Sequence, residues 1–223
     1  PLTSIRSALE TLPLVKTDAH REKLTALLQQ DVRRLDRLIT DISNASRLDA
    51  ELSRDRPRPI ELNQLLADIV GVYDTTAKPG DVPVRLAAPV EGLQVMGRDG
   101  PLGQVFRNLI DNARSFSPAG GEVRVSLDQV DGDRPIRVRV EDDGPGVPPD
   151  NLETVFERFY TSRPKGAAFG SNSGLGLSIV RQIVEAHGGR VWAENRIEDG
   201  RVAGAVFEIN LPAFAPVTPG RRP

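Results

Sequence analysis

The chain has 223 residues, of which 39% are hydrophobic and 27% charged, with a formal net charge of −2 at pH 7; this is the composition of an ordinary soluble protein. The near-neutral charge gives no electrostatic case for binding nucleic acid or an anionic membrane surface. The absence of cysteine excludes disulfides, thiolate nucleophiles and cysteine–zinc sites, and with only His20 and His187 present no histidine-rich metal site is expected.

Residues 1–53 have the apolar spacing of a helical hairpin. Pro13 ends a first short helix, and a second helix is expected over 19–53. The apolar residues of the second helix recur in two rows, formed by Leu28, Leu35 and Ile42 and by Leu38, Ala45 and Leu52. Because one hairpin cannot bury both rows, we expect two copies to associate as a four-helix bundle. The alternative is a hairpin packed on the rest of its own chain.

The rest of the chain predicts one layered domain. The charged, proline-rich stretch 54–59 indicates a linker, the domain is expected over 60–213, and a disordered tail over 214–223. No apolar run reaches the roughly 18 residues of a transmembrane helix, and no signal peptide is predicted within this sequence. Since the first residue is Pro1 rather than Met, we expect the chain to be a piece of a longer protein.

The expected elements of this domain alternate between helices and strands. Helices are expected over 60–73, 101–114, 151–160 and 174–189. Strands are expected within 82–96 and over 122–130, 136–144, 190–196 and 205–212. The strands at 122–130 and 136–144 are expected to form an antiparallel pair. This order favours an α+β fold, a two-layer α/β sandwich with a mixed, mostly antiparallel sheet.

Two asparagines stand one helical turn apart in the helix over 101–114. Asn108 and Asn112 therefore point the same way. Asparagine is a poor helix former, and two of them cost about 1 kcal/mol relative to alanine. Amide oxygens suit a hard cation such as Mg²⁺, which also takes phosphate oxygens and water. The alternative is a pair of solvated asparagines.

The stretch VEDDGPGV ends a predicted strand with two carboxylates and a G-x-G. Asp142 lies where a strand end can place a carboxylate in a pocket, and there it can accept a hydrogen bond from an exocyclic amine. Gly144 and Gly146 lack a Cβ, so a flat base could lie against the backbone. An ordinary turn after an edge strand is the alternative.

A second glycine pair, Gly174 and Gly176, precedes a predicted helix, where free N–H groups form an anion site. The stretch 163–173 before it is small and flexible, like a lid over a ligand. Arg163 and Lys165 in this stretch could meet phosphates, or they could belong to a solvated loop.

In this order, the N-x-x-x-N helix, D-x-G-x-G, FERFY and GLGL resemble the catalytic ATP-binding domain of sensor histidine kinases of the GHKL superfamily, over about 60–212. The resemblance implies the Bergerat fold with ATP and Mg²⁺ as cofactors. The opening PLTSIRSALETL resembles the end of the family's H-E-L-K-N-P-L-T-x-I motif, whose phospho-accepting histidine would then precede Pro1.

The resemblance also assigns roles to individual residues. Asn112 would coordinate Mg²⁺, with Asn108 reaching metal or phosphate, and Asp142 would bind the adenine amine. The other residues implied in the ATP site or at the base of its lid are Gly144, Gly146, Phe156, Phe159, Tyr160, Arg163, Lys165, Gly174, Leu175, Gly176 and Leu177.

Two positions depart from the family's pattern. The lysine often found three residues after the metal asparagine is Ser115 here, with Arg114 one place earlier as a candidate phosphate contact. The family's G-T-x-F is Gly204-Ala205-Val206-Phe207, which lacks the hydroxyl. Both departures concern phosphate contacts and not the fold.

By this resemblance the protein would autophosphorylate a histidine and pass the phosphoryl group to an aspartate of a response-regulator receiver domain. The hairpin would form a homodimer, and the chain would be a cytoplasmic fragment of an inner-membrane-anchored bacterial protein without direct membrane contact. The fragment is expected to bind ATP but not to autophosphorylate. The alternatives are a degenerate domain acting as a dimeric scaffold, and a non-kinase GHKL ATPase, which would carry glutamate in place of Asn108. Both His20 and His187 are expected to be structural.

Overall fold

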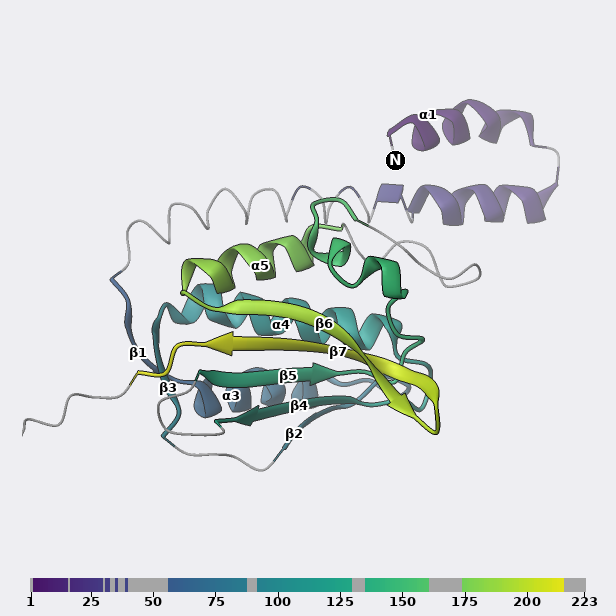
Figure 1. Ribbon diagram of the computed structural model, residues 1–223. Helices are drawn as coiled ribbons and strands as arrows, with labels where there is room; N and C mark the ends of the chain where they lie inside the picture. Colours follow the sequence, from purple (N-terminus) through teal and green to yellow (C-terminus); the bar gives the residue numbers. More distant parts are fainter. Residues whose placement is uncertain are drawn as a thin grey trace, which may run out of the picture.

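The computed structural model describes residues 2–15, 17–29, 31–32, 35, 39, 56–87, 92–129, 135–160 and 174–214. Figure 1 shows a helical N-terminal part and a domain in which helices lie on a sheet. None of the helices within these described ranges is long and apolar enough to span a bilayer.

The N-terminal part begins as the expected hairpin. Helix α1 (Leu2–Thr11) is followed by the 3₁₀ turn η1 (Leu12–Leu14) and by a helix described over 18–29. No residue of α1 is buried, and the side chain of Leu2 is 72% exposed. Most of the predicted second helix, and with it most of the two apolar rows, lies outside the described residues.

A small two-stranded sheet pairs β1 (Arg58–Glu61) with β3 (Gln94–Gly97) in antiparallel register. The prediction of a linker up to residue 59 was therefore wrong at its end, because the strand begins at Arg58. Pro59 has no N–H to donate, yet a proline is accommodated at a sheet edge, and here it stands opposite Met96. The charged side chain of Arg58 is held by Asp99, at 2.7 Å.

Among the described residues the main sheet has the spatial order β2 (Val84–Leu86), β4 (Val123–Asp128), β5 (Ile136–Glu141), β7 (Arg201–Leu211) and β6 (Arg190–Glu198). Only the β2–β4 pair is parallel. The predicted mixed, mostly antiparallel sheet is confirmed, as is the antiparallel pairing of β4 with β5. Along β5 buried and half-buried residues alternate, which is the pattern of a sheet with one covered face.

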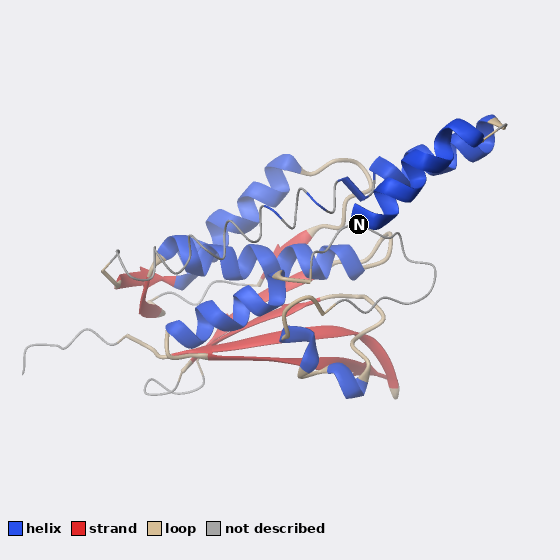
Figure 2. Cartoon of the chain, turned by 90° about the horizontal axis from the view of Figure 1, so that it is seen from above, coloured by secondary structure: helices blue, strands red, loops and turns tan. Residues whose placement is uncertain are grey.

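Helices α3 (Leu62–Thr76), α4 (Asp99–Phe116) and α5 (Gly176–Ala186) lie on one face of this sheet, as Figures 1 and 2 show from two directions. The core forms between the two layers, and its fully buried side chains include Leu66, Leu109, Val140, Ile183 and Ile209. The two-layer sandwich predicted from the sequence is thus confirmed.

Two further predictions were wrong in detail. In place of the short helix expected over 151–160 are two 3₁₀ turns, η2 (Pro149–Asn151) and η3 (Thr154–Phe156). The tail expected to be disordered from 214 is held at its first residue, because the Phe214 N–H donates to the Gln94 carbonyl at 2.6 Å. The rest of this tail lies outside the described residues.

Candidate functional site

Asp142 follows the last residue of β5 and is 1% exposed. Its Oδ1 accepts hydrogen bonds from the backbone N–H of Gly144 at 2.8 Å and of Ala205 at 3.0 Å. Its Oδ2 accepts none from any described residue. Burial raises the pKa of this carboxyl above its usual range. One oxygen is therefore fixed by the protein, while the other remains available to a donor from outside.

The glycines beside Asp142 are packed against the protein itself. A Cβ on Gly144 would lie 2.9 Å from the Phe116 carbonyl oxygen, at the end of α4. Gly146 has a φ of +75°, and a Cβ there would lie 2.6 Å from Oδ1 of Asn195 on β6. The sequence argument gave these glycines a surface for a flat base. The structure gives them a further task, since they let α4, β6 and β7 approach the loop closely.

Asn108 lies on the face of α4 toward the start of α5. Its Nδ2 donates to the Gly176 carbonyl at 3.2 Å. Its Oδ1 accepts no hydrogen bond from the described residues, so an amide oxygen remains for a ligand. Asn112 lies one turn further along α4 and is half-buried. The reading of two fully solvated asparagines therefore does not hold for Asn108.

The start of α5 joins the segment that ends at Tyr160. Gly174 has a φ of +78°, and a Cβ there would lie 2.9 Å from the Tyr160 carbonyl oxygen. The Phe159 N–H donates to the Gly174 carbonyl, also at 2.9 Å. Leu175 is buried and Leu177 packs against the core, so only their backbone N–H groups can face an anion at this helix terminus.

The two phenylalanines expected at the base of the lid differ in burial. Phe156 is buried and packs edge-to-face on Phe207, with ring centroids 6.1 Å apart, as an anchor should. Phe159 is 63% exposed, so its assignment as a core anchor was wrong. Its φ of +66° is the physical reason, because the bond to Gly174 holds its backbone in a left-handed conformation that turns the ring to solvent. Sequence spacing carries no sign of such a backbone turn.

Tyr160 has a ring that packs against the core. Its Oη is hidden from solvent and has no hydrogen-bond partner among the described residues. A buried hydroxyl without a partner is unfavourable by about 1–3 kcal/mol, so a ligand group or a water molecule is expected to meet it. The other two residues predicted for this region, Arg163 and Lys165, lie outside the described residues.

The side chain of Arg114 makes its contacts on a different face of α4 from the two asparagines. Its Nε donates to the Val82 carbonyl at 3.1 Å, its Nη2 lies 3.3 Å from Oδ2 of Asp81, and its guanidinium carbon lies 5.2 Å from the centre of the Tyr73 ring. Residues two apart on a helix do not share a face, so Arg114 does not point with Asn112. Its assignment as a phosphate contact is replaced by a role in holding α4 against α3 and the β2 loop.

His187 is structural, as predicted. Its Nδ1–H donates to the Ile183 carbonyl at 2.7 Å, and its Nε2 accepts from the Arg98 N–H at 3.2 Å. Burial lowers the pKa of this imidazole, which favours its neutral form. The ring thus links the end of α5 to the start of α4. His20 lies on the exposed hairpin beside Thr17.

The sequence reading missed the side chains that surround Asp143. This carboxylate is bound by Arg124 of β4 at 2.7 Å and by Arg196 of β6 at 2.6 Å. The hydrogen bond from Arg124 holds the pKa of Asp143 below its usual range. Charged residues at alternate strand positions are ordinary on a solvent-facing sheet, so the only available signal was the doubled aspartate in EDDG.

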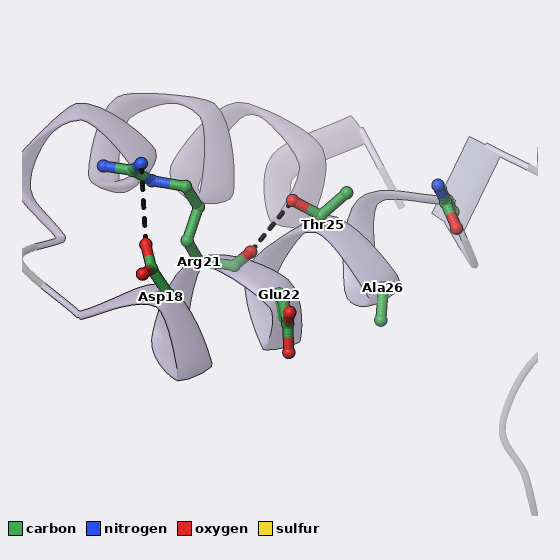
Figure 3. Close-up of a pocket in the computed structure, with 6 residues that line it drawn as sticks. Asp18, Arg21, Glu22, Thr25 and Ala26 are labelled. Atoms are coloured by element: carbon green, nitrogen blue, oxygen red, sulfur yellow. Dashed lines mark hydrogen bonds and ion pairs between the residues drawn. The ribbon is translucent and has the colours of Figure 1, made fainter.

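A hollow lies along the helix over 18–29 and is drawn in Figure 3. It is lined by Asp18, Arg21, Glu22, Thr25, Ala26 and Gln29. The Asp18–Arg21 ion pair spans 4.0 Å, with the Asp18 side chain 97% exposed. All its lining residues come from one exposed helix, so it is a surface groove with no buried polar group to recognise a ligand, in contrast to the neighbourhood of Asp142.

Comparison with known proteins agrees with this geometry. The family model described as histidine kinase-, DNA gyrase B-, and HSP90-like ATPase matches residues 97–214. Sensor protein ChvG of Agrobacterium fabrum (strain C58 / ATCC 33970) is 48% identical over 221 residues, which cover 96% of this chain and 37% of that protein. The chain thus spans little more than a third of this relative.

Two solved structures are also similar. The mycobacterial sensor histidine kinase MprB is 30% identical with a TM-score of 0.58, over 70% of this chain and 97% of that one. Full-length ShkA in complex with AMPPNP is 27% identical with a TM-score of 0.65, over 99% of this chain and 45% of that one.

Proposed function

Because the chain belongs to the histidine kinase-, DNA gyrase B- and HSP90-like ATPase family, and within it to the sensor histidine kinases, we propose that its sandwich binds ATP as the phosphoryl donor for a histidine. The observation that carries this proposal is the buried Asp142 carboxylate. Two backbone N–H groups hold its Oδ1, and no described residue uses its Oδ2.

Asp142 recognises the adenine in this proposal. Its Oδ2 accepts a hydrogen bond from the exocyclic amine, and a charge-assisted bond of this kind is among the stronger hydrogen bonds. The hidden Tyr160 hydroxyl is the second polar group expected to meet the nucleotide, at the base or the ribose. Gly144 and Gly146 keep the loop that carries Asp142 close to the protein.

The phosphates lie between α4 and the start of α5 in this proposal. Asn112 offers an amide oxygen to Mg²⁺. Asn108 offers to the metal or to a phosphate its Oδ1, which accepts no hydrogen bond from the described residues. No group of three or more acidic or histidine residues that could hold a metal occurs within the described ranges. This donor set fits Mg²⁺, which typically takes few protein ligands and completes its shell with phosphates and water. When bound, Mg²⁺ neutralises charge on the phosphates.

The N–H groups of 174–177 donate to the phosphates at the helix terminus, where the helix dipole favours negative charge. Arg163 and Lys165, which lie outside the described residues, remain proposed phosphate contacts. Catalysis by this domain consists of positioning the terminal phosphate and stabilising its charge.

The whole protein, of which this chain corresponds to a part, autophosphorylates a histidine that precedes the PLTSI stretch and transfers the group to an aspartate of a response-regulator receiver domain. The hairpin supports a homodimer in this proposal, because none of the residues of α1 is buried and Leu2, Leu9 and Leu14 are more than half exposed. Such apolar residues are buried when two hairpins form a bundle. We place the chain on the cytoplasmic side of a membrane-anchored protein.

A hydrolytic ATPase of the same superfamily is the weaker candidate. Its glutamate would stand where Asn108 donates a hydrogen bond to the Gly176 carbonyl. A carboxylate cannot donate to that carbonyl and would repel it. A degenerate scaffold is also disfavoured, since a buried carboxylate with one open oxygen is costly unless something binds it.

The test uses the parent protein, incubated with Mg²⁺ and ATP labelled at the γ-phosphate. We expect a protein-bound label that survives base and is lost in acid, as a phosphorus–nitrogen bond requires, and that is strongly reduced in the Asp142→Asn variant. A matched Arg201→Ala variant, changed at an exposed residue of β7, should label normally. Release of inorganic phosphate without any protein label would contradict the kinase assignment and favour the ATPase.

A further inference from the structure

We propose that Asn195 and Arg196 of β6 are positioning residues for the nucleotide site: together they hold the loop from Asp142 to Val147 in the conformation that recognises adenine. The inference rests on the proposed function and adds two residues to it. Neither residue belongs to any of the motifs singled out in the sequence, and both reach this loop from the outermost strand of the sheet.

Asn195 holds the far end of the loop. Its Oδ1 accepts from the Val147 N–H and its Nδ2 donates to the Val147 carbonyl, both at 2.7 Å. The side-chain amide therefore satisfies both backbone groups of one loop residue, as a neighbouring strand would do in a sheet. Gly146, which precedes Val147, lies so close to the same amide that a Cβ on it would be 2.6 Å from Oδ1 of Asn195. An alanine at position 195 would leave both backbone groups of Val147 without this partner.

Arg196 holds the near end of the loop. One guanidinium nitrogen, Nη2, lies 2.6 Å from Oδ1 of Asp143, 2.7 Å from the Ala203 carbonyl and 3.4 Å from the Asp142 carbonyl. The Arg196 side chain is only 19% exposed, so these interactions are shielded from solvent and stronger than a surface ion pair. Arg124 donates to the same oxygen of Asp143, Oδ1, at 2.7 Å. Asn195, Arg196 and Arg124 together are called the clamp below.

A β-bulge makes this arrangement possible. Arg196 pairs with Gly204 and Ile197 pairs with Val202, so Ala203 is the extra residue on β7. The bulge frees the Ala203 carbonyl to accept from Arg196. At Gly204 a Cβ would lie 1.8 Å from the Asp142 carbonyl oxygen, so β7 touches the loop where the bulge sits. Bulges re-aim side chains and are over-represented beside functional sites.

The positive charge of Arg196 also affects the pKa of the Asp142 carboxyl. Burial is the main cause of the raised pKa of Asp142, and the hydrogen bonds from the Ala205 and Gly144 N–H groups are the main opposing effects. Asp143 raises this pKa and Arg196 lowers it, both by smaller effects. The other charged group of the clamp, Arg124 from β4, lies against Asp143. The end of α4 presents the Phe116 carbonyl and Ser117 to this loop, and β7 presents the Ala205 N–H and the apolar side chain of Val202, none of which is charged. Removing Arg196 should therefore loosen the loop and also make Asp142 easier to protonate.

The experiment measures the affinity of the chain for ADP without divalent metal, between pH 5 and 8, for the unmodified protein and for Arg196→Ala, Asn195→Ala and Arg201→Ala. At pH 8 we expect about tenfold weaker binding for the first two variants, since a displaced recognition group loses affinity steeply, and no change for Arg201→Ala. Affinity falls in acid as Asp142 is protonated. The pH at which affinity falls should be higher for Arg196→Ala than for the unmodified protein. It should be unchanged for Asn195→Ala.

The protonation of ADP affects the measurements on all four proteins equally. We call the fall of affinity at low pH the acid limb, and a shift of the acid limb between two of the proteins therefore arises from the substitution. If the unmodified chain binds and both clamp variants bind within twofold of it at every pH, the inference is wrong and the proposed function stands. Weaker binding of Arg196→Ala with an unmoved acid limb also contradicts it, because that is what general loosening of the fold produces.

Absence of binding to the unmodified chain overturns the proposed function, and the inference with it. Should Arg196→Ala fail to fold, Arg196→Gln is used, which keeps a hydrogen-bond donor but removes the charge. The acid limb of Arg196→Gln should then move as expected for the alanine variant, and an unmoved limb rejects the inference.

Discussion

The two ends of the proposed nucleotide site are built by different means. At the adenine end a single buried carboxylate, Asp142, is fixed by backbone groups, and its loop is clamped by side chains from β4 and β6. At the phosphate end the groups are amides and N–H dipoles on α4 and α5, and Asn108 has one described bond to the neighbouring helix. The adenine end should thus be sensitive to single-atom changes, and the phosphate end should respond mainly through the metal.

The largest effect is expected from Asp142→Asn, which keeps the shape of the side chain. Its amide oxygen can still accept from Gly144 and Ala205, but the second position becomes an N–H donor that faces the adenine amine. We expect about 100-fold weaker ATP binding, as for a lost charged hydrogen bond that leaves two donors opposed. Calorimetric titration at pH 7.5 measures it, and an affinity within threefold of the unmodified chain would refute the adenine assignment.

The same variant should not destabilise the fold. Since the pKa of Asp142 is raised in the folded state, the folded protein favours the protonated form, and the ionised carboxylate opposes folding at neutral pH. Asparagine carries no charge, so the free energy of unfolding at pH 7.5 should be equal or higher. A large loss of stability in denaturant titrations would instead make Asp142 a mainly structural residue.

Gly204→Ala tests how closely β7 approaches the adenine end. The added Cβ would meet the Asp142 carbonyl oxygen at 1.8 Å, so one of the two segments must move. We expect the free energy of unfolding to fall by about 2 kcal/mol, within the range for overpacking, together with weaker nucleotide binding. The matched control is Gly71→Ala in α3, where a Cβ meets nothing within 4 Å. Its free energy of unfolding should rise by up to about 1 kcal/mol, because alanine favours a helix more than glycine does.

Asn112→Ala tests the phosphate end. We expect ATP binding to weaken about tenfold in the presence of Mg²⁺, as for the loss of one metal ligand, and to change little in its absence. The control on the same helix is Arg114→Ala, whose guanidinium is bound to Val82 and Asp81; its affinity should stay within twofold. Equal losses with and without Mg²⁺ would show that Asn112 does not act through the metal.

The smallest effect concerns the link between α4 and α5 at His187. Its pKa is lowered in the folded state, so the stability that it contributes is present above its unfolded pKa of about 6.5 and is lost as pH falls below that value. We expect His187→Gln to cost about 1 kcal/mol at pH 7.5, as for a lost hydrogen bond, and less at pH 5.5. Denaturant titrations at the two pH values measure this, and a cost that does not shrink in acid would contradict the neutral ring.

The sequence predicted those parts of the molecule that depend on local pattern. Alternation in β4 and β5 and the helical spacing of α4 and α5 are dictated by which face is buried, and these elements were confirmed. Strand β1 was not predicted because a proline such as Pro59 normally indicates the end of a strand or helix. It fits within β1 because that strand lies at a sheet edge, which the sequence does not reveal. The exposure of Phe159 depends on one backbone angle fixed by Gly174, which no periodicity encodes.

The clamp on the adenine loop was beyond the reach of sequence patterns for a related reason. Asn195 and Arg196 meet the loop only because a bulge shifts the register between β6 and β7. Asp142 could be proposed as a site residue from the sequence because it forms a local motif with two glycines at a strand end. Its supporting residues are about fifty positions away in the chain, and they become neighbours only when the sheet has formed.

The most direct test of the central claim is a calorimetric comparison of ATP and GTP with Mg²⁺, for the chain and for Asp142→Asn. The account predicts micromolar binding of ATP and much weaker binding of GTP, because guanine has a carbonyl oxygen where adenine presents its amine to the Asp142 carboxylate. The preference should largely disappear in Asp142→Asn. Binding of ATP and GTP with equal affinity, or a preference that survives this substitution, would contradict the account.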